Sequence, residues 1–184
     1  MNCRKAAWVL VCIVSFGSIY SLAAQAPGSP AAQIEEMKKI SFLVGEWEGE
    51  GWTEMVPGQR RTSPIREVVQ SKLGGLVLVV EGLGKRKDPG KSEETVTHNA
   101  LGFLYYDEKA KLYRMKSFLA DGRTVDAEAG FTDNGFQWWF KAQTVSIRYT
   151  VKLTEKGEWF ETGEMSFDGK TWRQFHEMTL QRVK

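Results

Sequence analysis

Closely spaced turn signals are the feature that most constrains the fold of this chain. After residue 45, dipeptides such as Asp121-Gly122, Asn134-Gly135 and Asp168-Gly169 recur at intervals of roughly 9 to 14 residues. These pairs tolerate the positive φ angles of two-residue hairpin turns. The segments between them leave no room for a helical crossover, so neighbouring strands are expected to be antiparallel.

Alternating hydrophobicity predicts which face of each strand is buried. In 145–153, Val145, Ile147 and Tyr149 alternate with Ser146 and Arg148, which is typical of a strand with one buried and one solvated face. The same pattern predicts ten strands, over residues 46–55, 61–72, 76–83, 95–106, 111–119, 123–131, 136–142, 145–153, 158–166 and 171–182. Residues 84–94 are expected to form a charged loop. Residues 34–44 are expected to form a short helix that ends at Gly45.

Ten antiparallel strands either close into a barrel or divide into two packed sheets. Hairpin-length connections along almost the whole chain favour an up-and-down barrel, which leaves no exposed sheet edge. The sequence therefore predicts an all-β, ten-stranded barrel with a short N-terminal helix, and a β-sandwich is the alternative.

The first 24 residues have the pattern of a secretory signal peptide. Arg4 and Lys5 precede an apolar stretch, and small residues near Ala23 and Ala24 offer a cleavage site. The expected organisation is a signal peptide (1–24), a flexible leader (25–33) and one β-barrel domain (34–184), with the mature protein secreted or periplasmic. No later segment is apolar and long enough to span a membrane.

Removal of this segment changes both the charge and the chemistry of the chain. The full sequence has 25 Lys and Arg against 23 Asp and Glu, and two of the cations lie in the predicted signal peptide. A mature chain without net charge does not favour nucleic acid as a partner. Cys3 and Cys12 also lie in this segment, so no thiol nucleophile or thiolate ligand is expected in the mature protein.

The start of the first predicted strand resembles the G-x-W signature of lipocalins and other calycins. Gly45 and Trp47 carry this pattern, and Arg182 on the last strand occupies the place of the family's basic residue. The resemblance implies that the tryptophan closes one end of the barrel and that the arginine packs across it. Leu73-Gly74-Gly75 and 168–172 (DGKTW) are similar to a set of secreted bacterial lipocalin-like proteins of unknown function.

The opening around 42–49 also resembles that of the nitrobindins, which are ten-stranded haem-binding barrels. That resemblance implies that His176, on the last strand, is the axial ligand of a haem iron. The alternative is a core or rim histidine that hydrogen-bonds to Gln174 or to a carboxylate. No cofactor is predicted from the residues themselves, and haem is the one that the resemblance allows.

Inward-facing aromatic and polar residues are the candidates for lining a ligand cavity. A ten-stranded barrel can enclose a small apolar ligand. The candidates are Tyr113, Met115, Trp138, Phe140, Tyr149, Trp172, Gln174, His176 and Met178.

Several acidic residues alternate with apolar ones and are candidates for inward-facing carboxyl groups. Glu67 and Glu81 lie in Val- and Ile-rich strands, and Glu161 follows Trp159. If they face inward, they need a partner, water or a proton, because burial of a bare carboxylate is costly. The alternative is that these strands are inverted and the acids lie outside. His98 is expected at the surface or the rim, and Trp52, on the acidic outer face of the first strand, under the N-terminal helix.

The chain lacks the sequence patterns of nucleophilic and metal-dependent enzymes. It contains no G-x-S-x-G motif, and two distant histidines do not make a metal site. The sequence favours a non-catalytic barrel that binds a small, largely apolar molecule. The alternatives are a nitrobindin-like haem protein and an enzyme that uses inward Glu, Tyr and His side chains.

Overall fold

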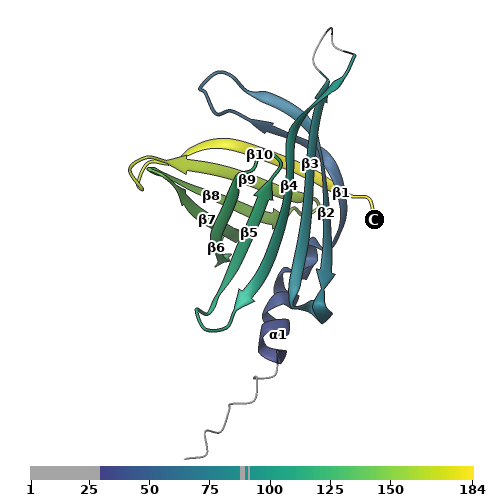
Figure 1. The fold of residues 1–184 in the computed structure, drawn as a ribbon, viewed down its shortest axis with the longest axis vertical. Helices are drawn as coiled ribbons and strands as arrows, with labels where there is room; N and C mark the ends of the chain where they lie inside the picture. Colours follow the sequence, from purple (N-terminus) through teal and green to yellow (C-terminus); the bar gives the residue numbers. More distant parts are fainter. Residues whose placement is uncertain (1–29, 88–89, 91) are drawn as a thin grey trace, which may run out of the picture.

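The computed structural model describes residues 30–87, 90 and 92–184, and they form one closed antiparallel barrel. Each strand pairs with its neighbours in sequence, and the first strand closes the barrel against the last (Figure 1). The strands are β1 (Gly45–Thr53), β2 (Arg61–Lys72), β3 (Val77–Lys87), β4 (Glu94–Asp107), β5 (Leu112–Leu119), β6 (Thr124–Thr132), β7 (Gly135–Ala142), β8 (Val145–Leu153), β9 (Trp159–Ser166) and β10 (Arg173–Arg182).

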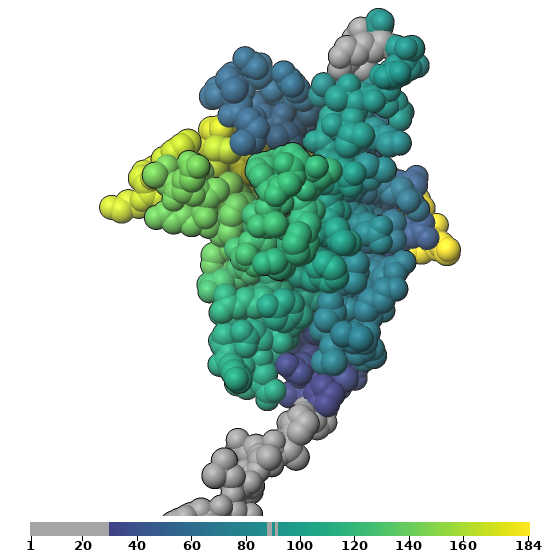
Figure 2. All heavy atoms as spheres, in the orientation of Figure 1, coloured from purple at the N-terminus to yellow at the C-terminus, as the bar shows by residue number. Residues whose placement is uncertain are grey.

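The predicted barrel is confirmed, and most strand boundaries agree to within about two residues. The exception is the segment 84–94, which was expected to be a loop. β3 instead continues to Lys87 and β4 begins at Glu94, so residues 84–87 and 94 of this charged segment belong to paired strands. Charged side chains are compatible with this extension because β3 and β4 project beyond the body of the barrel, where both faces meet solvent (Figures 1 and 2).

One end of the barrel is plugged by the N-terminal helix. α1 (Ala31–Ile40) is followed by the 3-10 turn η1 (Ser41–Leu43), and together they bury Met37, Ile40 and Leu43. Figure 2 shows the helix seated between the strand ends at the lower end of the molecule. The helix begins at Ala31, so part of the predicted leader is helical.

The predicted signal peptide lies outside the described residues. None of the described helices has the length and apolarity needed to cross a bilayer.

The helix is joined to the first strand through Gly45 and Trp47. Trp47 is completely buried and donates its indole N–H to the Leu43 carbonyl at 2.7 Å. The Arg182 guanidinium lies 4.0 Å from the centre of the Trp47 ring, and it donates to the carbonyls of Val44 and Phe42. Gly45 has a φ of 141°, and a Cβ there would overlap the Arg182 guanidinium. Arg182 thus packs across Trp47 and ties the last strand to the helical segment at the plugged end.

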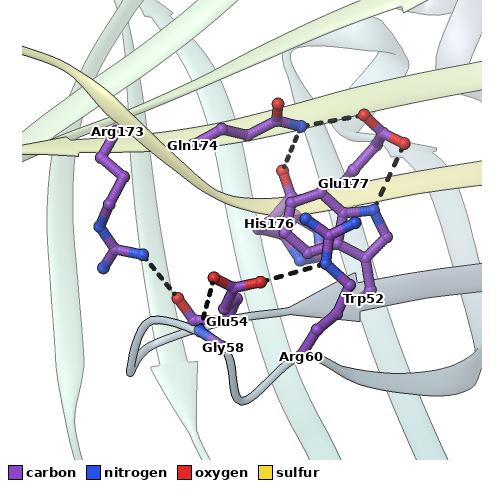
Figure 3. A network of polar contacts seen from close by, with 8 residues as sticks. All are labelled: Trp52, Glu54, Gly58, Arg60, Arg173, Gln174, His176 and Glu177. Carbon is purple, nitrogen blue, oxygen red and sulfur yellow. Dashed lines mark hydrogen bonds and ion pairs between the residues drawn. The ribbon is translucent and has the colours of Figure 1, made fainter.

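The outer face of β1 differs from the expectation in one residue. Its glutamates face outward as predicted, but Trp52 does not lie under the helix, which plugs the opposite end. Instead the Arg60 guanidinium lies 3.5 Å from the centre of the Trp52 ring, and the indole N–H donates to Glu177 (Figure 3). The hairpin between β1 and β2 therefore covers this indole.

Candidate functional site

The two histidines lie on the inner side of their strands near the open end of the barrel, each next to a β-bulge. The β3–β4 register shifts between Gly84 and Lys85, next to His98, and the β9–β10 register shifts between Gln174 and His176. His98 keeps the same side of β4 as Ala100, Gly102 and Leu104, and its Nε2 is 2.9 Å from the position that a Cβ on Gly82 would take. His98 was expected at the surface or the rim, and it is exposed at the open rim with its ring directed inward.

The bulge at Phe175 corrects two of the predicted cavity residues. Strict alternation along β10 placed Trp172, Gln174 and His176 on one inner face. Phe175 is buried where Gln174 was expected. Gln174 lies outside, where its amide donates to Glu177 at 2.9 Å (Figure 3). Trp172 precedes β10 and stacks against the Arg148 guanidinium on the outer wall.

Glu67 is an almost fully buried carboxylic acid inside the barrel. Its side chain is 7% exposed, and its oxygens lie 2.6 and 2.9 Å from the Cβ position of Gly82, the same point that His98 Nε2 approaches. No hydrogen bond joins this carboxyl group to another residue in the described part of the chain. Among the described residues no fully buried side-chain N or O atom lacks a partner, so the Glu67 oxygens border accessible space, where water or a ligand can bond to them.

Glu161 is a second buried acid on the same inner wall. It accepts a hydrogen bond from the Trp159 indole at 3.3 Å, and its charge acts on Glu67. Burial raises the pKa of both carboxyl groups to about 8, and for Glu67 the neighbouring Glu161 adds to the effect. Both acids therefore hold a proton at neutral pH. Because the protonated groups carry no charge, their burial inside the barrel costs much less free energy. Glu81, in contrast, is exposed on the outer face of β3.

Burial acts in the opposite direction on the imidazoles. It lowers the pKa of His98, and it lowers the pKa of His176 to about 4. His176 Nδ1 lies 3.2 Å from the Thr53 hydroxyl, and its ring is 5.9 Å from that of Tyr149. Two protonated acids and two neutral imidazoles give an interior with hydrogen-bonding groups and almost no charge at neutral pH.

The remaining predicted cavity residues divide between the interior and the plugged end. Trp138 stacks on Tyr149 with ring centres 4.0 Å apart, and Phe140 extends the stack. Met178 is buried against Gly51. Tyr113 lies at the plugged end instead, where its hydroxyl donates to the carbonyl of Glu36 in α1 at 2.9 Å. Its role is to fix the helix.

The structure also shows a cleft of about 920 Å³ on the outer wall of β5–β8. Its lining combines Trp172 of the outer wall with Met115 and Phe140, which face inward from β5 and β7 as predicted. Sequence reasoning missed this cleft because it depends on how two strands diverge. Among the described residues, no group of three or more His, Cys, Asp or Glu side chains could hold a metal ion.

Comparison with known proteins supports the fold. No family model matches the chain, and no curated protein does. Among solved structures it is similar to the crystal structure of Rv2717c from M. tuberculosis, with a TM-score of 0.56 and 14% identity, over 80% of this chain and 97% of that one. At this identity the similarity shows a shared barrel fold alone.

Proposed function

We propose that the protein binds a small, largely apolar molecule inside the barrel, with an uncharged polar group of that molecule placed against Glu67 and His98. The observation that carries the proposal is the Glu67 carboxyl group, which is buried, protonated at neutral pH and without a hydrogen bond to any described residue. A protonated carboxyl can both donate and accept, so a hydroxyl or carbonyl group of a ligand would satisfy it.

The apolar part of the ligand would lie against the aromatic stack of Trp138, Tyr149 and Phe140. Such stacks provide a large apolar contact area, and the few polar groups beside them fix the orientation of a ligand. The predicted signal peptide supports a location outside the cytoplasm. We therefore propose a secreted or periplasmic binding protein without catalytic activity.

The test uses decan-1-ol, an apolar chain with one hydroxyl group, and follows its displacement of the uncharged fluorescent probe N-phenyl-1-naphthylamine. The matched variants are Glu67→Leu and Glu81→Leu, which remove an inner and an outer glutamate from neighbouring strands. We expect Glu67→Leu to weaken decan-1-ol binding about tenfold, because one hydrogen bond to the ligand is lost. Glu81→Leu should leave binding unchanged. Equal binding by both variants would contradict the assignment of Glu67.

Haem is a second candidate, favoured by the position of His176. Its imidazole faces inward, is neutral at pH 7 and is oriented through Nδ1 by Thr53. A neutral imidazole is a donor that a haem iron accepts, so His176 would hold the iron, and haem would supply redox chemistry there.

A haemin titration separates the two candidates. A stoichiometric Soret shift that His176→Ala abolishes and His98→Ala preserves would establish the haem site. A shift that survives both substitutions would indicate an apolar cavity only, and no shift would exclude the haem candidate.

A further inference from the structure

The barrel wall is split between β6 and β7. Their hydrogen-bonded register runs from Thr132↔Gly135 to Glu128↔Trp139 and ends there. The same register would next bring Ala127 opposite Phe140 and Asp126 opposite Lys141, but these residues are unpaired across the wall. β6 continues to pair with β5, and β7 with β8. Figure 1 shows β7 and β8 sloping away from β5 and β6. The wall therefore opens as a wedge, which we call the seam.

The large cleft lies at this seam. Its lining combines side chains of the outer wall with four inward-facing apolar ones, Met115, Ala127, Phe140 and Ile147. A groove on an intact sheet would be lined from the outer face alone, because alternate side chains point to the two faces of a strand. The mixed lining indicates that the cleft extends through the wall towards the interior.

Most cations on the outer rim of the seam are paired with carboxylates. Arg114 pairs with Glu128 at 3.0 Å, Lys116 with Asp126 at 2.9 Å and Arg148 with Glu164 at 2.8 Å. Lys141 also lines the cleft and has no ion-pair partner in the described part of the chain. Since Asp126 is already taken by Lys116, the charge of Lys141 is left without a counter-ion at the edge of the opening.

The interior of the barrel disfavours an anion, in contrast to the rim of the seam. A carboxylate or phosphate beside Glu67 and Glu161 would lose its hydration in an interior whose imidazoles are neutral and do not compensate its charge, which is unfavourable. An anionic group is therefore excluded from the interior and attracted at the seam, whereas an alkyl chain is accepted by the seam lining and by the aromatic stack.

We propose that the ligand is an amphipathic anion whose anionic head stays outside, held by Lys141, while its apolar chain passes through the seam between β6 and β7 and carries the uncharged polar group that reaches Glu67. This inference rests on the proposed binding function and adds the ligand class and the route. The anion is a carboxylate, sulfate or phosphate on an apolar chain, since the rim provides charge and hydrogen-bond donors that serve all three.

The test compares decanoate with decan-1-ol, which share an apolar chain and differ in the charge of the head. The variants are Lys141→Glu, which reverses the charge at the seam, and Lys156→Glu, which makes the same change in the exposed hairpin between β8 and β9. Both sites are exposed, so both variants should fold. We expect decanoate to bind the wild type about tenfold more tightly than decan-1-ol. Lys141→Glu should remove this advantage and leave decan-1-ol binding within twofold, and Lys156→Glu should change neither.

The route is tested by the amide NMR shifts that decanoate causes in the ¹⁵N-labelled protein. The largest shifts are expected at Ala127, Phe140 and Lys141, and shifts confined to the open end, at Thr53 and Thr97, would overturn the seam as the route. Equal affinities for the two probes, or equal losses in Lys141→Glu, would overturn the anion assignment and leave the binding function standing. Failure of both probes to bind would overturn the binding function itself.

Discussion

The two ends of the barrel differ in how their polar groups are satisfied. At the plugged end, the Trp47 indole, the Tyr113 hydroxyl and the Arg182 guanidinium all donate to backbone carbonyls of the helical segment. Inside the barrel, Glu67 and His98 both approach Gly82, and neither has a hydrogen bond to a described residue. The polar groups at the plugged end therefore stabilise the fold, whereas Glu67 and His98 remain available to hydrogen-bond a ligand.

This difference indicates that the plugged end mainly stabilises the fold and that the interior around Glu67 mainly serves binding. Natural proteins retain unsatisfied buried groups mainly where a ligand satisfies them, because such groups reduce the free energy of unfolding. Substitutions at the plugged end should thus destabilise the fold, whereas substitutions at Glu67 should stabilise the fold and harm binding.

The largest effect is expected for Trp47→Ala. It removes a completely buried indole, its hydrogen bond to Leu43 and its edge-on contact with Trp159, whose ring centre lies 5.8 Å away. The loss of free energy of unfolding should be about 3–5 kcal/mol. Urea unfolding measures it, and Trp139→Ala on the outer wall is the control, with an expected loss below about 1 kcal/mol. Similar losses in the two variants would show that the plugged end is not the stable part of the fold.

The second effect is a dependence of stability on pH that originates from the buried acids. Carboxyl groups of the unfolded chain titrate near 4.5, whereas Glu67 and Glu161 have pKa values raised to about 8 by burial. Between these values the folded state holds protons that the unfolded state has lost. The free energy of unfolding therefore falls as the pH rises towards 8, by at most about 1.4 kcal/mol per pH unit for each proton.

The histidines limit this slope on the acid side. The pKa of His176 is lowered to about 4, so below about pH 6.5 the unfolded chain takes up a proton that the folded state does not. The two effects oppose each other there, and the net fall should be clearest between about pH 6.5 and 8.

Glu67→Leu tests the origin of the slope. This variant should lose about half of it and be more stable than the wild type at pH 8, and Glu81→Leu should keep the full slope. Urea unfolding at four pH values across the window gives the comparison. A wild-type free energy of unfolding that is constant from pH 6.5 to 8 would show that the buried acids do not titrate in this range.

The sequence predicted the plugged end better than the open end for a physical reason. The plugged end follows from local patterns: the 3.6-residue period that buries Met37 and Ile40, the turn at Gly45 and the alternation that turns Trp47 inward. Each of these depends on only a few neighbouring residues.

The open end depends on irregularities that a period of two cannot show. The bulge at Phe175 moved Gln174 to the outside, which strict alternation along β10 did not predict. Both faces of β3 are apolar, so alternation did not show that Glu81 faces outward. It therefore could not be distinguished from Glu67 of β2, which faces inward. The glycines at 82 and 84 mark the inner face of β3, because the side chains of Glu67 and His98 occupy the space beside them. That signal was in the sequence. The seam was not, since strand divergence is a property of the whole barrel.

The smallest changes in the free energy of unfolding are expected at two arginine–tryptophan stacks, one at each end of the barrel, which can be compared directly. Arg182 lies over Trp47 at the plugged end, and Arg60 lies over Trp52 at the open end. Arg182 also donates to two backbone carbonyls of the helical segment, while Arg60 pairs with the Glu54 carboxylate at 3.2 Å, mostly in solvent. Loss of Arg182 leaves those carbonyls without a donor, whereas water replaces Arg60 easily.

We therefore expect Arg182→Ala to lower the free energy of unfolding by about 1–2 kcal/mol and Arg60→Ala by about 0.5 kcal/mol. Double-mutant cycles with Trp47→Phe and Trp52→Phe separate the stacking from the hydrogen bonds in each pair. Because the two rings lie at similar distances from their cations, the stacking energies should be similar, and the excess for Arg182 should remain in the Trp47→Phe background. If the excess disappears there, the stability of the plugged end comes from the stack itself and not from the carbonyls that Arg182 satisfies.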